Sequence, residues 1–251
     1  NKSSFSYLTQ HVRVTVCGST PTQRNYCWKA DSKQFSASGS VIKNIKNSSY
    51  ILTAGHFCSV DRTQVIQASV DPEFIDRTFK RLEEVGFESF IEVETGDGVT
   101  QRAEVVAANQ ELDVCILKTD KIDVVPLKLA ASPPSYGADV WNLASPLGII
   151  VPGSVPVLKG IYSGDAKMRG LEVSVITDLP ATFGCSGSPV LNKDGDIVSM
   201  IYSTNARFDN LSYGVTLDNL RKFIDKTFVT NKNKVVTSGN TTVEVEEPDY
   251  D

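Results

Sequence analysis

Apolar and polar residues alternate along many short stretches of this chain, which is the pattern of half-buried β-strands. In residues 11–17, for example, Val12, Val14 and Val16 share one face, and His11 begins the polar, solvated face. Similar stretches predict further strands at 36–42, 50–53, 89–93, 100–107, 114–117, 139–143, 157–162, 171–177, 187–191, 196–202 and 213–216. Turn sequences at 46–49 and 193–195 separate neighbouring strands, so the pattern predicts a protein built mainly from β-hairpins.

Two segments instead have the 3.6-residue spacing of amphipathic helices. The first begins with Asp71, Pro72 and Glu73: a capping residue, a proline suited to the first helical position, and an acid in the first turn. Apolar residues then recur at helical spacing up to Gly86, a residue suited to end a helix. These signals predict a helix of about four turns over residues 71–86. The second predicted helix has these residues on one face: Leu217, Leu220, Phe223, Ile224 and Phe228.

A proline-rich segment, 129–135, is the best candidate for an internal boundary, because paired prolines suit neither a sheet nor a helix. It separates residues 1–128 from residues 129–228, and the polar segment 229–251 that follows is expected to be disordered. Five acids in that tail account for the whole net charge of −5: Glu244, Glu246, Glu247, Asp249 and Asp251. The body is balanced, without a basic stripe, so we expect no nucleic-acid partner.

The chain has 251 residues, of which 41% are hydrophobic, enough to fill a large core. It has no run of about 18 apolar residues, so no membrane span is predicted. The sequence begins with Asn1 rather than with a methionine, and no apolar signal core follows. We therefore expect it to be a processed or excised piece. Secretion and excision from a larger precursor both stay open, and the oligomeric state is not indicated.

Candidate chemistry lies in three short motifs. Ser186 stands in a glycine-rich stretch, 184–189, whose small residues leave a hydroxyl exposed and backbone N–H groups free to turn toward it. His56 ends an apolar run, and Asp113 opens another. A serine hydroxyl needs a base, and a histidine base needs an acidic partner that fixes its tautomer. The order His, Asp, Ser is that of the chymotrypsin triad.

These motifs resemble those of trypsin-like serine proteases, and most closely the HtrA-type and glutamyl endopeptidase branches. Residues 53–56 (Thr-Ala-Gly-His), 113–118 (Asp-Val-Cys-Ile-Leu-Lys) and 184–189 (Gly-Cys-Ser-Gly-Ser-Pro) resemble the three triad motifs, in the right order. The segment 142–148 (Asn-Leu-Ala-Ser-Pro-Leu-Gly) is similar to the HtrA segment that opens the second barrel. The likeness runs from about residue 38 to residue 228.

The resemblance implies an all-β, chymotrypsin-like fold: two packed six-stranded antiparallel β-barrels with a C-terminal helix, and here an inserted helix packed on the first barrel. Residues 1–128 would form the barrel that carries His56 and Asp113, and residues 129–228 the barrel and closing helix that carry Ser186. The implied activity is that of a serine endopeptidase on polypeptide substrates, with no cofactor. Ser186 would be the nucleophile, His56 the base and Asp113 its orienting acid, with the N–H groups of Gly184 and Ser186 forming the oxyanion hole. No His/Cys cluster has metal-ligand spacing, so no metal is expected.

The family also implies where the pocket for the residue before the scissile bond lies. It corresponds to two segments here: Pro180, Ala181, Thr182 and Phe183, and Ser199, Met200 and Ile201. None of these side chains is charged, and a buried unpaired charge is costly. We therefore expect cleavage after small or medium uncharged residues such as Val, Ala, Leu or Thr. A shift of the second segment by one residue would exchange inward and outward side chains.

Five cysteines leave at least one unpaired within the chain. Cys115 lies in an apolar run and is expected to be a buried thiol, and Cys185 is expected to be a structural thiol rather than the nucleophile. Cys17 and Cys27 flank a turn-rich segment, where a bridge and two ordinary thiols are equally consistent with the sequence.

Other classes of function fit less of the sequence. An α/β-hydrolase would need glycine where Ser188 stands and a histidine after the serine, whereas His56 comes first. An inactive binding module on the same fold stays open, because fold alone does not decide function. A viral or phage polyprotein-processing protease with narrow specificity is a further alternative.

Overall fold

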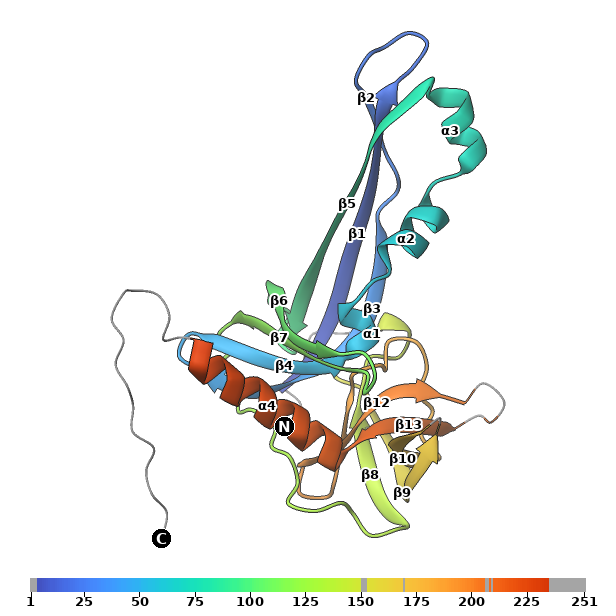
Figure 1. The fold of residues 1–251 in the computed structure, drawn as a ribbon. Coiled ribbons are helices and arrows are strands. Elements are labelled where there is room, and N and C mark those ends of the chain that lie inside the picture. Colours follow the sequence, from blue (N-terminus) through green and yellow to red (C-terminus); the bar gives the residue numbers. More distant parts are fainter. Residues whose placement is uncertain (1–3, 150–152, 169, 206–207, 209, 235–251) are drawn as a thin grey trace.

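The computed structural model describes residues 4–149, 153–168, 170–205, 208 and 210–234. It contains two β-barrels side by side, with one long helix lying across them (Figure 1). Each barrel is a ring of six antiparallel strands, so the predicted double-barrel fold is confirmed. Within the described ranges, no helix is both long and apolar enough to cross a membrane.

The first barrel closes because its first strand pairs with its fifth as well as with its third. Around the ring the order is β1 (Phe5–Ser19), β3 (Lys33–Ile45), β4 (Ser48–Ala54), β7 (Val114–Asp120), β6 (Thr100–Asn109) and β5 (Arg81–Thr95). The hairpin predicted around residues 46–49 joins β3 to β4. Inward residues such as Leu8, Val41 and Leu117 are fully buried, as the period-two pattern predicts.

Two strands of this barrel continue far beyond it. The outer residues of β1 (13–19) and β5 (81–90) pair with each other and project away from the barrels (Figure 1). A strand that the sequence pattern did not predict, β2 (Tyr26–Lys29), pairs with β1 there, and a Cys17–Cys27 disulfide joins the two. We call these segments, with the helices α2 (Arg62–Ser69) and α3 (Pro72–Thr78) beside them, the arm. The arm has its own core, which includes Val12, Val14, Val16, Val65, Ile75 and Phe79.

The helix predicted over residues 71–86 is only half right. It begins as expected, because the Asp71 carboxylate accepts a hydrogen bond from the Glu73 N–H and Pro72 takes the first position. It ends at Thr78, and from Arg81 the chain is strand β5. Gly86, interpreted as a helix stop, lies opposite Thr15 of β1. Pairing along the whole length of β1 satisfies the backbone of this segment, which outweighs a local helical periodicity that the sequence alone could not weigh against it.

The second barrel is a closed ring whose strands all lie within segments that the sequence pattern predicted or directly extend them. Its order is β10 (Leu171–Thr177), β13 (Leu211–Thr216), β12 (Ile197–Thr204), β11 (Pro189–Leu191), β8 (Ala138–Leu143) and β9 (Val157–Met168). A bulge interrupts the pairing of β12 with β13 between Ile201 and Ser203. The bulge shifts the register of β12 next to the nucleophile segment, which matters for the pocket described below.

The closing helix α4 (Leu217–Lys234) connects the two barrels. Leu220 and Phe223 join a core that takes residues from both barrels, among them Leu52, Ile116, Ile197 and Met200. Farther along, Phe228 packs edge-on against Tyr50 of β4. Because the helix runs to Lys234, disorder does not begin at residue 229 as predicted, and residues 235–251 lie outside the described part of the chain.

Candidate active site

His56 lies on a single helical turn, α1 (Gly55–Cys58), that begins where strand β4 ends. Gly55 allows this turn to approach strand β7, because a Cβ at this position would stand 2.8 Å from the Val114 backbone nitrogen. The His56 side chain is about half exposed. The apolar run before His56 therefore ends in a turn that holds the imidazole at the barrel surface.

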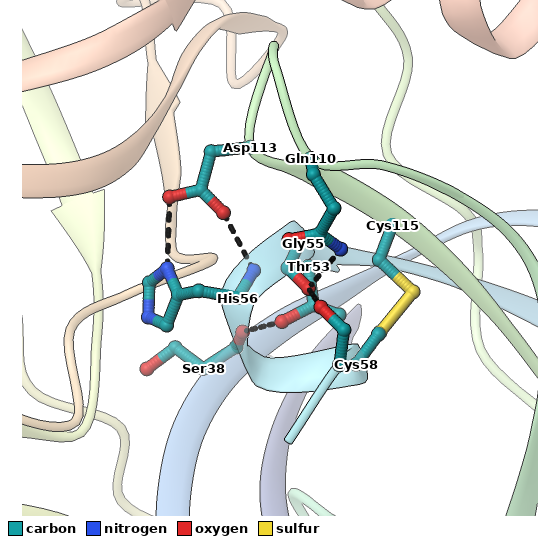
Figure 2. The surroundings of a disulfide bond; sticks show 9 residues. Ser38, Thr53, Gly55, His56, Cys58, Gln110, Asp113 and Cys115 are labelled. Carbon is teal, nitrogen blue, oxygen red and sulfur yellow. Dashed lines mark hydrogen bonds and ion pairs between the residues drawn. A yellow bond between two sulfur atoms is a disulfide. The ribbon is translucent and has the colours of Figure 1, made fainter. Parts of the chain in front are cut away.

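Asp113 makes two hydrogen bonds to His56, one to its imidazole and one to its backbone (Figure 2). Its Oδ2 lies 2.8 Å from His56 Nδ1, and its Oδ1 accepts a 2.6 Å hydrogen bond from the His56 backbone N–H. Asp113 has φ of 54°, a left-handed conformation that Asp tolerates better than most residues. Because an ionised carboxylate can only accept, Nδ1 carries the proton and Nε2 is left as an acceptor.

A disulfide that the sequence did not predict joins the turn that carries His56 to the strand that follows Asp113. Cys58, on the His56 turn, is bonded to Cys115, two residues after Asp113 (Figure 2). Cys115 is buried as predicted, but it is not a free thiol, so that prediction was wrong. The sequence could not pair these residues, because 57 positions separate them and only the pairing of β4 with β7 brings them together.

The loop that carries Ser186, which we call the nucleophile loop, comprises residues 183–189. A hydrogen bond fixes the orientation of the peptide between Phe183 and Gly184. The Leu147 N–H donates a 2.6 Å hydrogen bond to the Phe183 carbonyl oxygen. In a planar trans peptide the C=O and the following N–H point in opposite directions, so the Gly184 N–H is turned away from Leu147. Gly184 has φ of 90°, and a Cβ there would stand 2.3 Å from the Ser145 carbonyl oxygen. Only glycine fits this position without displacing the loop.

Ser38 of the first barrel anchors the nucleophile loop, a role that the sequence analysis missed. Its N–H donates to the Ser186 carbonyl oxygen at 2.8 Å, and its hydroxyl donates to the Gly184 carbonyl oxygen at 2.7 Å. The same hydroxyl accepts from the Ser145 N–H at 3.0 Å. One buried serine of the first barrel is therefore hydrogen-bonded to three residues of the second half of the chain. No local sequence pattern indicates this role.

Cys185 is a buried free thiol beside Ser186, which agrees with the predicted structural role. Burial raises the pKa of the Cys185 thiol, and a weaker opposing effect comes from the backbone of Thr182. A neutral, inaccessible thiol is a poor nucleophile. Ser186, which is less buried than Cys185 and lines the cavities described next, remains the candidate nucleophile.

Two cavities meet at these residues, and both are lined by His56, Phe183 and Ser186. Within the described part of the chain, Ser186 and His56 share these walls without a hydrogen bond between them, and such bonds often tighten only when substrate binds. The smaller cavity has a volume of about 340 Å³. Its remaining lining residues are Ala181, Thr182, Ile201, Tyr202, Ser203 and Thr204.

Four of the seven residues predicted for the substrate pocket line this smaller cavity: Ala181, Thr182, Phe183 and Ile201. The structure places the others elsewhere. Met200 is buried in the core between the barrels, and the Ser199 hydroxyl donates to the Val215 carbonyl oxygen. Pro180 does not line the cavity. Three residues at and beyond the bulge in β12, Tyr202, Ser203 and Thr204, line the cavity as well.

In the described part of the chain, no group of three or more His, Cys, Asp or Glu side chains is placed to hold a metal ion. The site's polar groups are instead arranged around a serine, an imidazole and a carboxylate. This combination is that of nucleophilic acyl-transfer chemistry.

The family model of the trypsin-like peptidase domain matches residues 37–200, and the chain belongs to this family. It is 30% identical over 133 residues to a probable periplasmic serine endoprotease DegP-like of Halomonas elongata, which covers 50% of this chain and 27% of that protein. It is 25% identical over 148 residues to protease Do-like 1, chloroplastic, of Arabidopsis thaliana, covering 55% of this chain and 34% of the relative. The chain thus spans only about a third or less of these relatives' lengths.

Solved serine protease structures share the fold. The inactive form of Rv3671c from M. tuberculosis superposes with a TM-score of 0.57 at 18% identity, covering 91% of this chain and 88% of that one. A serine endoprotease from Yersinia pestis gives a TM-score of 0.56 at 17% identity, covering 87% and 63%. The trypsin-like assignment made from the motifs is confirmed, and the chain is similar to DegP-like relatives, as the resemblance to the HtrA branch implied.

Proposed function

We propose that this chain is a serine endopeptidase that cleaves polypeptides after small or medium uncharged residues. The observation that carries the proposal is that Asp113 is hydrogen-bonded to His56, and that His56 lines the same two cavities as Ser186. Family membership supports the same reaction class. The details of catalysis follow from the positions of the side chains.

In the proposed reaction, Ser186 Oγ attacks the scissile carbonyl while His56 Nε2 takes its proton. His56 then protonates the departing amine, and Asp113 stabilises the charged imidazole without itself being protonated. The Gly184 N–H, held by the Leu147–Phe183 hydrogen bond, stabilises the developing oxyanion together with the Ser186 N–H. Water then hydrolyses the acyl-enzyme by the same route, with His56 again the base.

The proposed preference for uncharged residues rests on the smaller cavity. Apart from His56, its lining residues carry no ionisable group other than the Tyr202 phenol, so a charged side chain would be buried without an ion-pair partner. Asp178, the nearest acid to this segment in sequence, is exposed and does not line the cavity. A volume of about 340 Å³ is small beside typical ligand pockets, which suits side chains such as Val, Ala, Leu or Thr.

Three substitutions test the catalytic assignment. Ser186→Ala, His56→Ala and Asp113→Asn should each lower kcat for peptide hydrolysis by about 10⁴-fold or more, because these groups act as one unit. Circular dichroism spectra should match the wild type, and a fluorophosphonate should label the wild type at Ser186 alone. Cys185→Ala is the matched control, expected to retain activity; full activity in folded Ser186→Ala would refute the assignment.

A peptide library cut by the wild-type protein tests the specificity. The residue before the cleaved bond should be predominantly Val, Ala, Leu or Thr. Cleavage mainly after Lys, Arg, Glu or Asp would show that the smaller cavity is not the pocket for this residue.

A further inference from the structure

Of the two cavities that both His56 and Ser186 line, the larger is built mostly from residues of the first barrel. It has a volume of about 550 Å³, and its walls come from β1, β3, α1 and α2. It shares only three residues with the smaller cavity: His56, Phe183 and Ser186. If the smaller cavity takes the residue before the scissile bond, the larger one faces the part of the substrate that leaves with the amine.

Gln10 makes this cavity unusual. It occupies an inward position of β1, between the buried apolar residues Leu8 and Val12. Its side chain is 4% exposed, and no described residue donates a hydrogen bond to its Oε1. A buried amide oxygen without a partner costs about 1–3 kcal/mol. Three other buried side chains in the described residues have such an atom (Ser6, Ser40 and Asn142), but Gln10 is the one that lines the cavity of His56 and Ser186, where a ligand could complete its hydrogen bonds.

The other walls define the body of that ligand. Phe57 and Val65 are buried at the cavity, and Phe35 and Val60 add apolar surface. The only carboxylate among the lining residues, Asp61, already accepts hydrogen bonds from the N–H groups of Thr63 and Gln64 as the cap of α2. An acidic side chain would be repelled by Asp61, and an apolar ring would cover the aromatic and valine surface.

We propose that this cavity is a specificity site for one of the two residues after the scissile bond, and that it takes a tyrosine whose hydroxyl is bound by Gln10. This inference rests on the proposed endopeptidase activity. A phenol hydroxyl can donate a hydrogen bond, and the Gln10 Oε1 can accept one. A bound tyrosine would therefore supply the hydrogen bond that the Gln10 Oε1 lacks. Helix α2 of the arm supplies part of the wall through Gln64 and Val65, so the arm takes part in substrate selection.

The test uses quenched peptides with Val before the cleaved bond and Tyr, Phe or Ala at each of the two following positions. Wild type should cleave the Tyr peptide with kcat/KM about three- to tenfold above the Phe peptide at one of these positions, the worth of a neutral hydrogen bond. Both should exceed the Ala peptide. Gln10→Leu should bring the Tyr to Phe ratio near one while still favouring Phe over Ala.

A second variant, on the exposed surface of α2, tests the same cavity in case Gln10→Leu does not fold. Gln64 is exposed on α2 and lines the cavity, whereas Gln67 is exposed on the same helix and does not. Gln64→Trp should fill the cavity and abolish the preference for Tyr and Phe over Ala, and Gln67→Trp should leave it unchanged. Equal cleavage of all three peptides by wild type, or an unchanged Tyr to Phe ratio in Gln10→Leu, would overturn the proposal.

The methyl ester of an acyl-valine, whose leaving group is only methanol, separates this failure from failure of the proposed function. It has no residue after the scissile bond, so its hydrolysis needs the catalytic groups but not the larger cavity. Ester hydrolysis by wild type without any Tyr preference on peptides would refute the specificity site alone. Absence of both ester and peptide hydrolysis would refute the endopeptidase and, with it, the site that depends on it.

Discussion

Single residues at the nucleophile loop hold conformations that other side chains could not adopt. Gly184 combines φ of 90° with an approach of 2.3 Å between a hypothetical Cβ and the Ser145 carbonyl oxygen. Strain and steric clash would act together in any other residue there, and both would displace the N–H proposed to bind the substrate oxygen. Loop geometry at this one position is therefore a direct requirement of the proposed catalysis.

Gly184→Ala should lower kcat by about 10²-fold or more, because losing an oxyanion donor has that effect. The matched control is Gly195→Ala, where φ is 84° but no atom lies within 4 Å of the added Cβ. The control should lose some stability from backbone strain and keep its kcat. Steady-state kinetics with the ester substrate gives both values, and equal kcat values for the two variants would contradict the role of Gly184.

The residues that sequence reasoning found and those it missed differ in a physical way. His56, Asp113 and Ser186 were predicted because each stands next to a glycine or an apolar run, and because the three follow one another in a recognisable order. Ser38 and Gln10 were not predicted, because their roles come from contacts between segments far apart in the chain. A serine in a strand and a glutamine in a valine-rich stretch have no distinctive local pattern.

At the scale of elements, the Cys58–Cys115 disulfide connects the turn that carries His56 to the strand that follows Asp113. It acts on the same two elements as the Asp113–His56 hydrogen bonds. The second disulfide, Cys17–Cys27, lies in the arm instead. Removing each disulfide in turn therefore compares the effect of a cross-link at the candidate site with that of a cross-link away from it.

The double variant Cys58→Ser/Cys115→Ser should lose both stability and kcat. Closing a loop of this length is worth up to about 4 kcal/mol by chain entropy, and the His56 turn loses its anchor to β7. Cys17→Ser/Cys27→Ser should lower the melting temperature with kcat on the ester retained. Thermal unfolding and ester kinetics measure the two effects, and an unchanged kcat in the first variant would show that the hydrogen bonds alone position His56.

Elements were predicted well where one face of a strand is buried in a barrel and poorly in the arm. The strands of the second barrel lie in short apolar or alternating stretches bounded by turn residues, so pattern and structure agree. In the arm, residues 81–86 have spacing that fits a helix and a strand equally, and the partner strand β1 decides between them. The paired residues of β1 precede those of β5 by some 65 positions, so a prediction from a local window of sequence cannot take this pairing into account.

On the scale of the whole molecule, one core and one helix join the two barrels across the site. Leu220 of α4 is fully buried in the core that both barrels share. Arg221 beside it donates to the carbonyl oxygen of Ala130, at the start of the second half. The relative position of Ser186 and His56 therefore depends on contacts far from either residue.

Leu220→Ala should lower the free energy of unfolding by about 2–5 kcal/mol, the usual cost of such a cavity in a core. Leu82→Ala in the arm, where the side chain is 47% exposed, should change it far less. Chemical denaturation followed by both tryptophan fluorescence and loss of activity measures the effect. Separate transitions for the two signals would show that the barrels unfold independently rather than through the shared core.

The disulfide beside the catalytic pair also has a consequence for where this protein can mature. Disulfides form and persist in oxidising compartments such as the periplasm or the extracellular space, and glutathione keeps cytosolic thiols reduced. The two cross-links, Cys17–Cys27 and Cys58–Cys115, leave only the buried Cys185 as a thiol. A chain produced in a reducing cytosol would carry the same residues but lack the anchor of the His56 turn, so the export route of the producing cell would determine how much active protein it makes.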